Sequence, residues 1–371
     1  MPTLEATPTS EEPSPMCPAR RQRASRTSVV LLALALPLIA GACTDAGYPA
    51  PARTTSTPLA VATTTSPPPS DTPSPTPPPM AAETPERAAA VAASVMTAAV
   101  GAIGATGASG RAAREAAFTG SALTAANAQN ALLGTLTAAE KDNPVLSDAE
   151  PVVLAISQGA AYPRSIVVKT TRRSSGFPLL TLLLAPDEAQ GYRVAAWATL
   201  LPGATISGFP ELQGGSPLAK TAAEAGPTVD PVLADYAASL AFPAPPAAER
   251  AFVDDSFAAA VRQGAQSQAD ALGSAGSLTQ QHEYQGVLAG LRLADDQGTV
   301  VFAQLDRADV LKEKTANALT PSKAFTALSG KTLIDTQATE QTVEYLLVRF
   351  PVTGKAAVLG AAQQLYAASG T

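Results

Sequence analysis

Two stretches, LLLAPDEAQGYRVAAWATLL (182–201) and LRLADDQGTVVFAQLDRADVL (291–311), decide the fold class. Each is an apolar run, an acidic turn that ends in glycine, and a second apolar run, which is the pattern of a β-hairpin. The predicted turns are Asp187 to Gly191 and Asp295 to Gly298. The similarity of the two stretches indicates a weak internal duplication.

Further strands and helices are predicted around each hairpin. Helices should come first in each half, because Thr84 can cap a helix that has Pro85 at its first position, and because 111–137 and 246–272 have helical spacing. A break is expected near Thr119 and Gly120. Short apolar runs bounded by turn residues then predict strands at 151–157, 165–171, 178–186 and 192–201, and at 282–293, 299–311, 342–352 and 355–366. The predicted class is α+β, with two related units of helix plus curved antiparallel sheet.

Composition divides the chain into five parts. Residues 1–42 form a predicted signal peptide of the lipoprotein type, and 44–83 a disordered tether rich in Thr, Ser and Pro, because such a composition cannot bury a core. The first α+β domain is predicted at 84–210, a linker rich in small residues at 211–245, and the second α+β domain at 246–371. Within the first domain, the glycines of GAIGATGASG (101–110) predict a flexible break between helices.

The N-terminal region predicts where in the cell the protein is located. A basic stretch (20–28) precedes VVLLALALPLIAGA (29–42), which at fourteen uncharged residues fits the apolar part of a signal peptide and is short for a membrane span of roughly 20 residues. Small residues directly before Cys43 resemble the bacterial lipobox, in which the cysteine thiol takes a diacylglyceryl group and becomes the mature N-terminus. Lipidation of Cys43 would anchor the protein on the extracellular face of the plasma membrane. An ordinary signal peptide and an uncleaved anchor are the alternatives.

Several segments together resemble a known group of proteins. They are the lipobox, the tether, Tyr162-Pro163-Arg164 at the start of a strand, Gly191-Tyr192-Arg193-Val194 in a hairpin, and ADDQGTVVFAQL (294–305). The chain is similar in these features to a group of uncharacterised actinobacterial secreted lipoproteins. The resemblance implies architecture and location, and it carries no activity with it.

Composition excludes several classes of function. The net charge of -6 gives no basic surface for nucleic acid. The chain has two cysteines, and Cys17 lies ahead of the predicted cleavage point, so the mature protein would have one. A disulfide, a cysteine zinc site and an iron–sulfur cluster are therefore not expected, and we expect no metal and no cofactor.

Catalytic patterns are also missing. His282 is the only histidine, and we interpret it as a partly exposed residue at a strand start, since no Gly-x-Ser-x-Gly elbow accompanies it. Gly330-Lys331-Thr332 lacks the first glycine of a phosphate loop. Asp254-Asp255 has the pattern of a helix start and Asp295-Asp296 that of a turn. Arg172-Arg173 is expected at a hairpin tip, where it could contact a wall polymer or a lipid head group, and Trp197 in the core.

The predicted function is a non-catalytic, lipid-anchored envelope protein that binds a protein partner or a small ligand. The rival is a hydrolase that acts on wall glycan or lipid through two carboxylates roughly 5–10 Å apart in an open groove. A deep cleft lined by residues with perturbed titration would favour the hydrolase over the binding protein.

Overall fold

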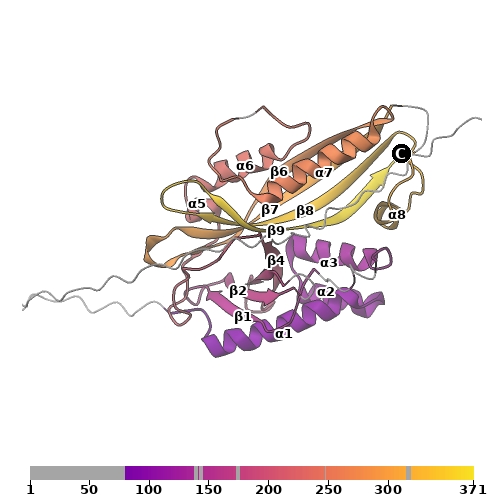
Figure 1. Cartoon of the computed structure of the whole chain (residues 1–371). Helices are drawn as coiled ribbons and strands as arrows, with labels where there is room; N and C mark the ends of the chain where they lie inside the picture. Colours follow the sequence, from indigo (N-terminus) through magenta and orange to yellow (C-terminus); the bar gives the residue numbers. More distant parts are fainter. Residues whose placement is uncertain (1–79, 138–140, 142–144, 173–175, 247, 315–318) are drawn as a thin grey trace, which may run out of the picture.

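The computed structural model describes residues 80–137, 141, 145–172, 176–246, 248–314 and 319–371. The predicted signal peptide, Cys43, most of the tether and Arg173 lie outside the described residues. Figure 1 shows helices arranged around one strongly curled antiparallel sheet. The predicted α+β class is confirmed.

The sheet consists of two meanders joined at one edge. The first is β1 (Val152–Ile156), β2 (Arg164–Thr171), β3 (Pro178–Ala185) and β4 (Arg193–Leu200). The second is β6 (Gly276–Arg292), β7 (Thr299–Glu313), β8 (Gln337–Phe350) and β9 (Ala357–Gly370), with the two-residue β5 (Leu218–Ala219) at its outer edge. The order is β1-β2-β3-β4-β9-β8-β7-β6-β5. All eight predicted strands are confirmed, and the two hairpin stretches form the β3–β4 and β6–β7 pairs.

Both predicted turns are also confirmed. Asp187 accepts hydrogen bonds from the backbone N–H and the side chain of Gln190, which closes the first turn. In the second turn Asp295 and Asp296 have positive φ angles of 52° and 51°. At Gly298 (φ 99°) a Cβ atom would collide with the backbone of Phe350, so the close approach of the two chains requires glycine there.

Helices cover both faces of the sheet (Figure 1). On one face lie α1 (Pro85–Gly104), α2 (Gly107–Ala117) and α3 (Gly120–Leu132), and on the other α5 (Ala222–Ala225), α6 (Val229–Ser239) and α7 (Ser256–Leu272). The short α8 (Lys323–Ser329) packs at the far end of the long strands. Side chains of β7 and β8 alternate between the two faces, so strands of the second half contribute to the core beneath α1–α3 as well.

Three helix predictions are resolved by local contacts. Thr84 caps α1 and Pro85 begins it, as predicted. The glycine run contains a break of only two residues, since α1 ends at Gly104 and α2 begins at Gly107. The helix predicted at 246–272 begins ten residues later than expected, because Asp255 caps it by accepting a hydrogen bond from the backbone N–H of Ala258. The stretch 211–245, predicted as a linker, contains β5, α5 and α6, which pack on the α7 face through Val229, Leu233 and Tyr236.

Arg114 and Asn130 tie the first three helices together. The Arg114 guanidinium is buried and donates to the carbonyl oxygens of Ala102 and Ala105 and to the Asn127 side chain. Asn130 donates to the carbonyls of Ile103 and Ala105. These donors satisfy the carbonyl groups of Ile103 and Ala105 at the end of α1, and the Ala102 carbonyl accepts from the Ala105 N–H as well. Among the described residues, α1 is the one helix whose length and composition would allow it to span a membrane, and its Ala88, Ala92 and Met96 are buried in the core.

Candidate functional site: a polar layer and an apolar groove

A layer of polar side chains interrupts the core on the sheet face that α7 covers. The strands bring it together because residues two apart on one strand share a face and because β6, β7 and β8 pair in register. On either side of the layer the same strands contribute apolar residues, such as Leu305 and Leu346 toward α6 and Leu278 and Leu311 toward α8. The layer comprises Gln280, His282, Arg307, Asp309, Glu340, Thr342, Glu344 and Gln363.

His282 and Glu344 form the innermost pair of this layer. Both side chains are fully buried, and Nδ1 of His282 lies 2.9 Å from Oε2 of Glu344. The amide nitrogen of Gln280 donates to the Leu240 carbonyl and lies 2.8 Å from Nε2 of His282, so the hydrogen-bond network assigns Nδ1 as the ring donor to Glu344. The interpretation of His282 as partly exposed at a strand start is therefore wrong: the residue lies well inside β6, on its covered face.

Arg307 is the guanidinium at the centre of the layer. It lies 3.3 Å from Oε1 of Glu344 and 3.1 Å from Oδ2 of Asp309, and it donates to Oε1 of Gln363 at 2.8 Å. Burial alone would raise the pKa of Glu344, but the contacts from His282 and Arg307 outweigh burial and hold that pKa below its ordinary value. Glu344 is thus an ionised carboxylate in the core.

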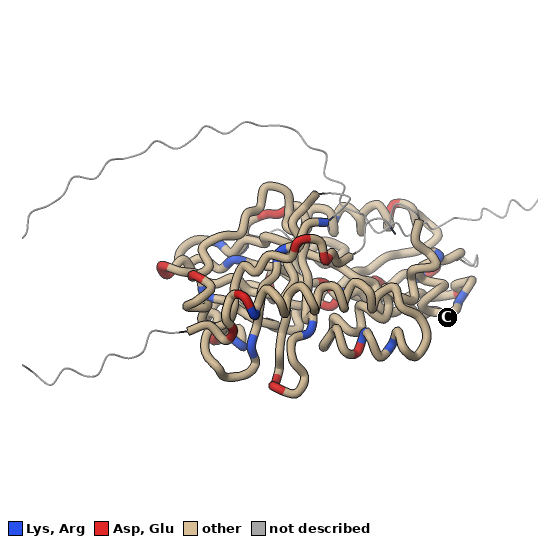
Figure 2. The backbone as a smooth tube through the Cα atoms, turned by 90° about the horizontal axis from the view of Figure 1, so that it is seen from below, with Lys and Arg blue, Asp and Glu red and all other residues tan. Residues whose placement is uncertain are grey.

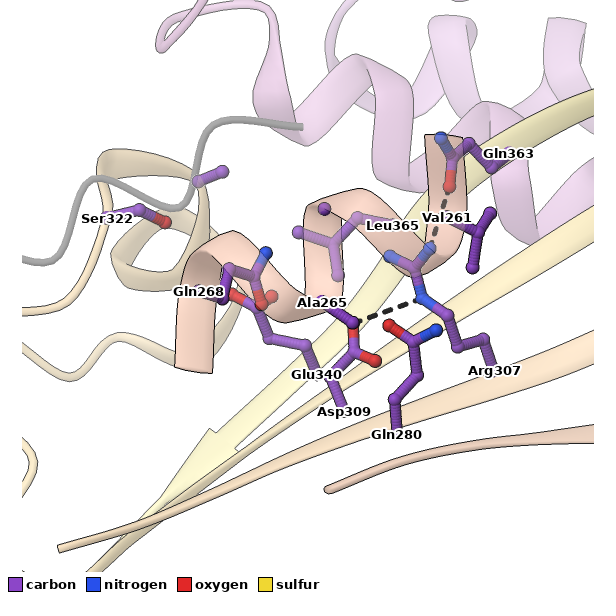
Figure 3. A pocket seen from close by; sticks show the side chains of 12 residues that line it. Val261, Ala265, Gln268, Gln280, Arg307, Asp309, Ser322, Glu340, Gln363 and Leu365 are labelled. Atoms are coloured by element: carbon purple, nitrogen blue, oxygen red, sulfur yellow. Dashed lines mark hydrogen bonds and ion pairs between the residues drawn. The ribbon is translucent and has the colours of Figure 1, made fainter. Parts of the chain in front are cut away.

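Asp309 and Glu340 face each other across β7 and β8 beside a small cavity (Figure 3). Burial is the main cause that raises the pKa of Asp309, although Arg307 opposes it. Burial and the neighbouring Asp309 together raise the pKa of Glu340 to about 7. The cavity has a volume of about 30 Å³ and is closed on one side by Val261, Gly264, Ala265 and Gln268 of α7. That volume corresponds to about one water molecule.

A second hollow lies on the opposite side of the sheet, between α1 and α2. This α1–α2 groove has a volume of about 400 Å³. The Tyr192 side chain lines it, and its hydroxyl is buried without a hydrogen-bond partner among the described residues. Burial raises the pKa of Tyr192, so the phenol stays protonated and can donate a hydrogen bond. The remaining lining is almost wholly of small side chains: Ser94, Val95, Thr97, Ala98, Gly101 and Ala102 from α1, and Ala113, Ala116 and Ala117 from α2.

The residues singled out by sequence take structural positions. Asp255 is the N-cap of α7, and Asp295-Asp296 lies in the hairpin turn. Gly330 ends α8 in a left-handed conformation, so no helix follows the Gly-Lys-Thr string as a phosphate loop requires. Trp197 is buried in the core against Phe118 and Tyr345, as predicted. Arg172 is partly buried, and burial lowers its pKa.

The polar layer escaped the sequence reasoning, although a signal for it exists. Arg307 and Asp309, and likewise Glu340, Thr342 and Glu344, occur at every second position of their strands. Such spacing places charges on one face, but only the register and the position of α7 make that face an inner one. Elsewhere in the described part of the chain, positively and negatively charged residues are interspersed (Figure 2). No group of three or more His, Cys, Asp or Glu within that part is arranged to hold a metal ion.

Comparisons of the chain with protein-family models, with curated proteins and with solved structures find no match.

Proposed function

We propose that the protein is a non-catalytic, lipid-anchored protein of the cell envelope that holds a small apolar ligand in the α1–α2 groove. The lipobox at Cys43 and the tether that follows it support the location on the extracellular face of the plasma membrane. The observation that carries the binding function is the groove itself. Its volume of about 400 Å³ and its small apolar lining fit the usual character of small-molecule sites, roughly 300–1,000 Å³ with few polar groups.

Tyr192 lines the groove, although its hydroxyl oxygen is buried from solvent. A ligand in the groove would therefore contact the apolar part of this side chain, and an uncharged, apolar ligand fits the lining best. No charged side chain lines the groove, so a strongly charged ligand would lose its hydration there without compensation.

The hydrolase that acts through two carboxylates is less well supported. Asp309 and Glu340 are a close carboxyl pair with raised pKa values, which is the kind of perturbation that favours an enzyme. Their cavity of about 30 Å³ lies beneath α7, however, and is far smaller than a sugar ring or an acyl chain. The open groove that this rival needs is on the other face of the sheet and contains no carboxylate.

The binding proposal is tested with Gly101→Leu. Gly101 lines the groove on α1, and an added Cβ would meet nothing within 4 Å, so leucine should fill the groove without a clash. The probe is N-phenyl-1-naphthylamine, an uncharged apolar fluorophore. We expect saturable fluorescence enhancement with the wild-type protein and a loss of at least about tenfold in affinity, about 1.4 kcal/mol, with Gly101→Leu.

The matched control is Gly104→Leu, on the same helix, which is equally open to solvent but does not line the groove. It should bind the probe as the wild type does. Competition by 1-dodecanol should displace the probe from the wild type and from Gly104→Leu alike. Equal binding by both leucine variants would refute the groove as the site.

The location is tested separately by mass spectrometry. Protein extracted from membranes should have a diacylated or triacylated Cys43 at its N-terminus, and Cys43→Ser should appear in the soluble fraction. An unmodified N-terminus, or residues 1–42 still attached, would contradict the anchor and leave the groove to be judged by the binding experiment alone.

A further inference from the structure

We infer that Asp309 and Glu340 share a single proton and together form a protonation site that keeps α7 packed on the sheet. This site lies on the sheet face opposite the α1–α2 groove and does not depend on the ligand proposed for that groove. It explains two buried oxygen atoms that the fold otherwise leaves without partners.

The geometry of the pair comes from the strand register. Asp309 and Glu340 are directly opposite residues of the antiparallel β7–β8 ladder. Side chains in such positions have Cβ atoms roughly 4.5–5.5 Å apart, which puts their carboxyl groups in reach of each other. Asp309 is 2% exposed and Glu340 5% exposed. Oδ1 of Asp309 and Oε1 of Glu340 are buried without a hydrogen-bond partner among the described residues.

One proton would satisfy both oxygens. A protonated Glu340 can donate an O–H···O⁻ hydrogen bond to the free oxygen of Asp309, and hydrogen bonds of this charge-assisted kind are short and strong. Two ionised carboxylates in the same place would repel each other, and each would lack a donor. The remaining oxygen of Asp309 is already paired with Arg307 at 3.1 Å.

The charges around the pair leave Glu340 without a cation of its own. The layer contains three carboxyl groups against one guanidinium, and Arg307 is engaged with Asp309 and Glu344. His282 on β6 is directed to Glu344, so even a protonated imidazole would leave one negative charge in excess. The cavity lining adds no further charge from α7, α8 or β9; α7 contributes Gln268 and β9 contributes Gln363 as polar groups.

The direction of the pH effect follows from the raised affinity for the proton. Burial and the Asp309 charge raise the pKa of Glu340 from 4.5 to about 7, and Arg307 only partly opposes this. The folded state therefore binds the proton more tightly than the unfolded chain does. The resulting stabilisation is fully present below about pH 4.5 and is lost as the pH rises through about 7. Above that pH, two charges lie beneath Val261 and Ala265 of α7.

The experiment is hydrogen–deuterium exchange of the α7 backbone amides at pH 5.5 and pH 8.5, corrected for the intrinsic pH dependence of exchange. In the wild type we expect roughly 10- to 30-fold less protection at the higher pH. Glu340→Gln keeps the shape, removes the charge and donates from its amide to Asp309, so its protection should be high at both values. Glu283→Gln, an exposed position on β6, is the control and should behave as the wild type does.

Infrared spectroscopy and a cation experiment test the shared proton further. Infrared spectra of the wild type should contain a protonated carboxyl band that titrates near pH 7 and is absent from Glu340→Gln. The same pH dependence in wild type and Glu340→Gln, or no such band in the wild type, would overturn the shared proton. Restoration of protection at pH 8.5 by Na⁺ or K⁺, but not by choline at equal ionic strength, would overturn it too, because the cavity would then be a cation site.

Discussion

Individual side chains in this protein matter most where charge is buried. Arg307 stands between two carboxylates that are 2% and 0% exposed, and it pairs with both. Removing one partner of a buried ionic network leaves the other charges without compensation. The resulting loss of stability exceeds the net stabilisation that the whole network contributes. The polar layer is therefore sensitive to loss of a single member.

For Arg307→Met we expect a loss of about 3–5 kcal/mol in the free energy of unfolding, because Asp309 and Glu344 would be left buried without a cation. Urea denaturation at pH 7.5 measures the loss. Lys312→Met, an exposed position on the same strand, should change the free energy by less than about 0.5 kcal/mol. Similar values for the two variants would contradict the pairing of Arg307 described here.

Residue types alone predicted part of this picture. The alternating apolar residues around Trp197 predict its position in the core, and the preference of acidic residues for helix starts predicts the position of Asp255. The polar neighbours of His282, Gln281 and Glu283, are exposed and favour an exposed position that His282 does not have. Whether a strand residue is buried depends on what packs on its face of the sheet, and the sequence does not give the position of α7.

Among the elements, α1, α2 and α3 are joined chiefly by the buried Arg114 side chain. Arg114 of α2 fastens the last turn of α1 to α3 through Ala102, Ala105 and Asn127. α1 lacks a glycine cap in a left-handed conformation, and Ala105 follows it with extended geometry. The carbonyl groups at its end are therefore satisfied by side chains from the neighbouring helices.

Arg114→Met should lower the free energy of unfolding by about 2–3 kcal/mol, because three hydrogen bonds from a charged group would be lost. The carbonyl groups of Ala105 and Ala102 would keep the bonds from Asn130 and from the Ala105 N–H. Chemical denaturation followed by circular dichroism gives the value. Arg111→Met, one turn earlier on the exposed side of α2, is the comparison and should be nearly neutral. A neutral Arg114→Met would show that α1 ends independently of this joint.

The elements themselves were largely readable from the chain. The eight longer strands are predicted, because apolar runs between turn residues have few other interpretations, whereas the two-residue β5 lies in the predicted linker. The apolar residues before Asp255 imitate helical spacing and predict a start of α7 ten residues too early, whereas the hydrogen bond from the Ala258 N–H to the capping residue Asp255 fixes the boundary. The stretch 211–245 does not predict α5 and α6, because its Gly, Pro and small residues have the composition of a linker.

The two meanders of the sheet meet along a narrow seam. β4 and β9 pair through Thr199 with Ala361 and Leu200 with Gly360. At the other edge, backbone hydrogen bonds link the end of β1 to Ser216, just before β5. A Cβ atom on Gly360 would lie 2.9 Å from the carbonyl oxygen of Thr199. The strands can approach so closely because that position is glycine.

Gly360→Ala should therefore lower the free energy of unfolding by about 1–3 kcal/mol, since the seam must open to admit one methyl group. Thermal denaturation provides the test. Gly134→Ala, at an exposed position where an added Cβ would meet nothing within 4 Å, serves as the control and should be close to neutral. Unchanged stability of Gly360→Ala would mean that the seam is looser than its register implies.

The seam also has a consequence for the order of folding. β4 must find its partner in a strand that lies beyond the four helices α5–α8 and the four strands β5–β8 along the chain. Contacts so distant in sequence form late, because the chain between them has to be ordered first. Until β9 arrives, the apolar strand β4 presents an open edge, which another copy could join. We therefore expect slow refolding whose yield falls as the protein concentration rises.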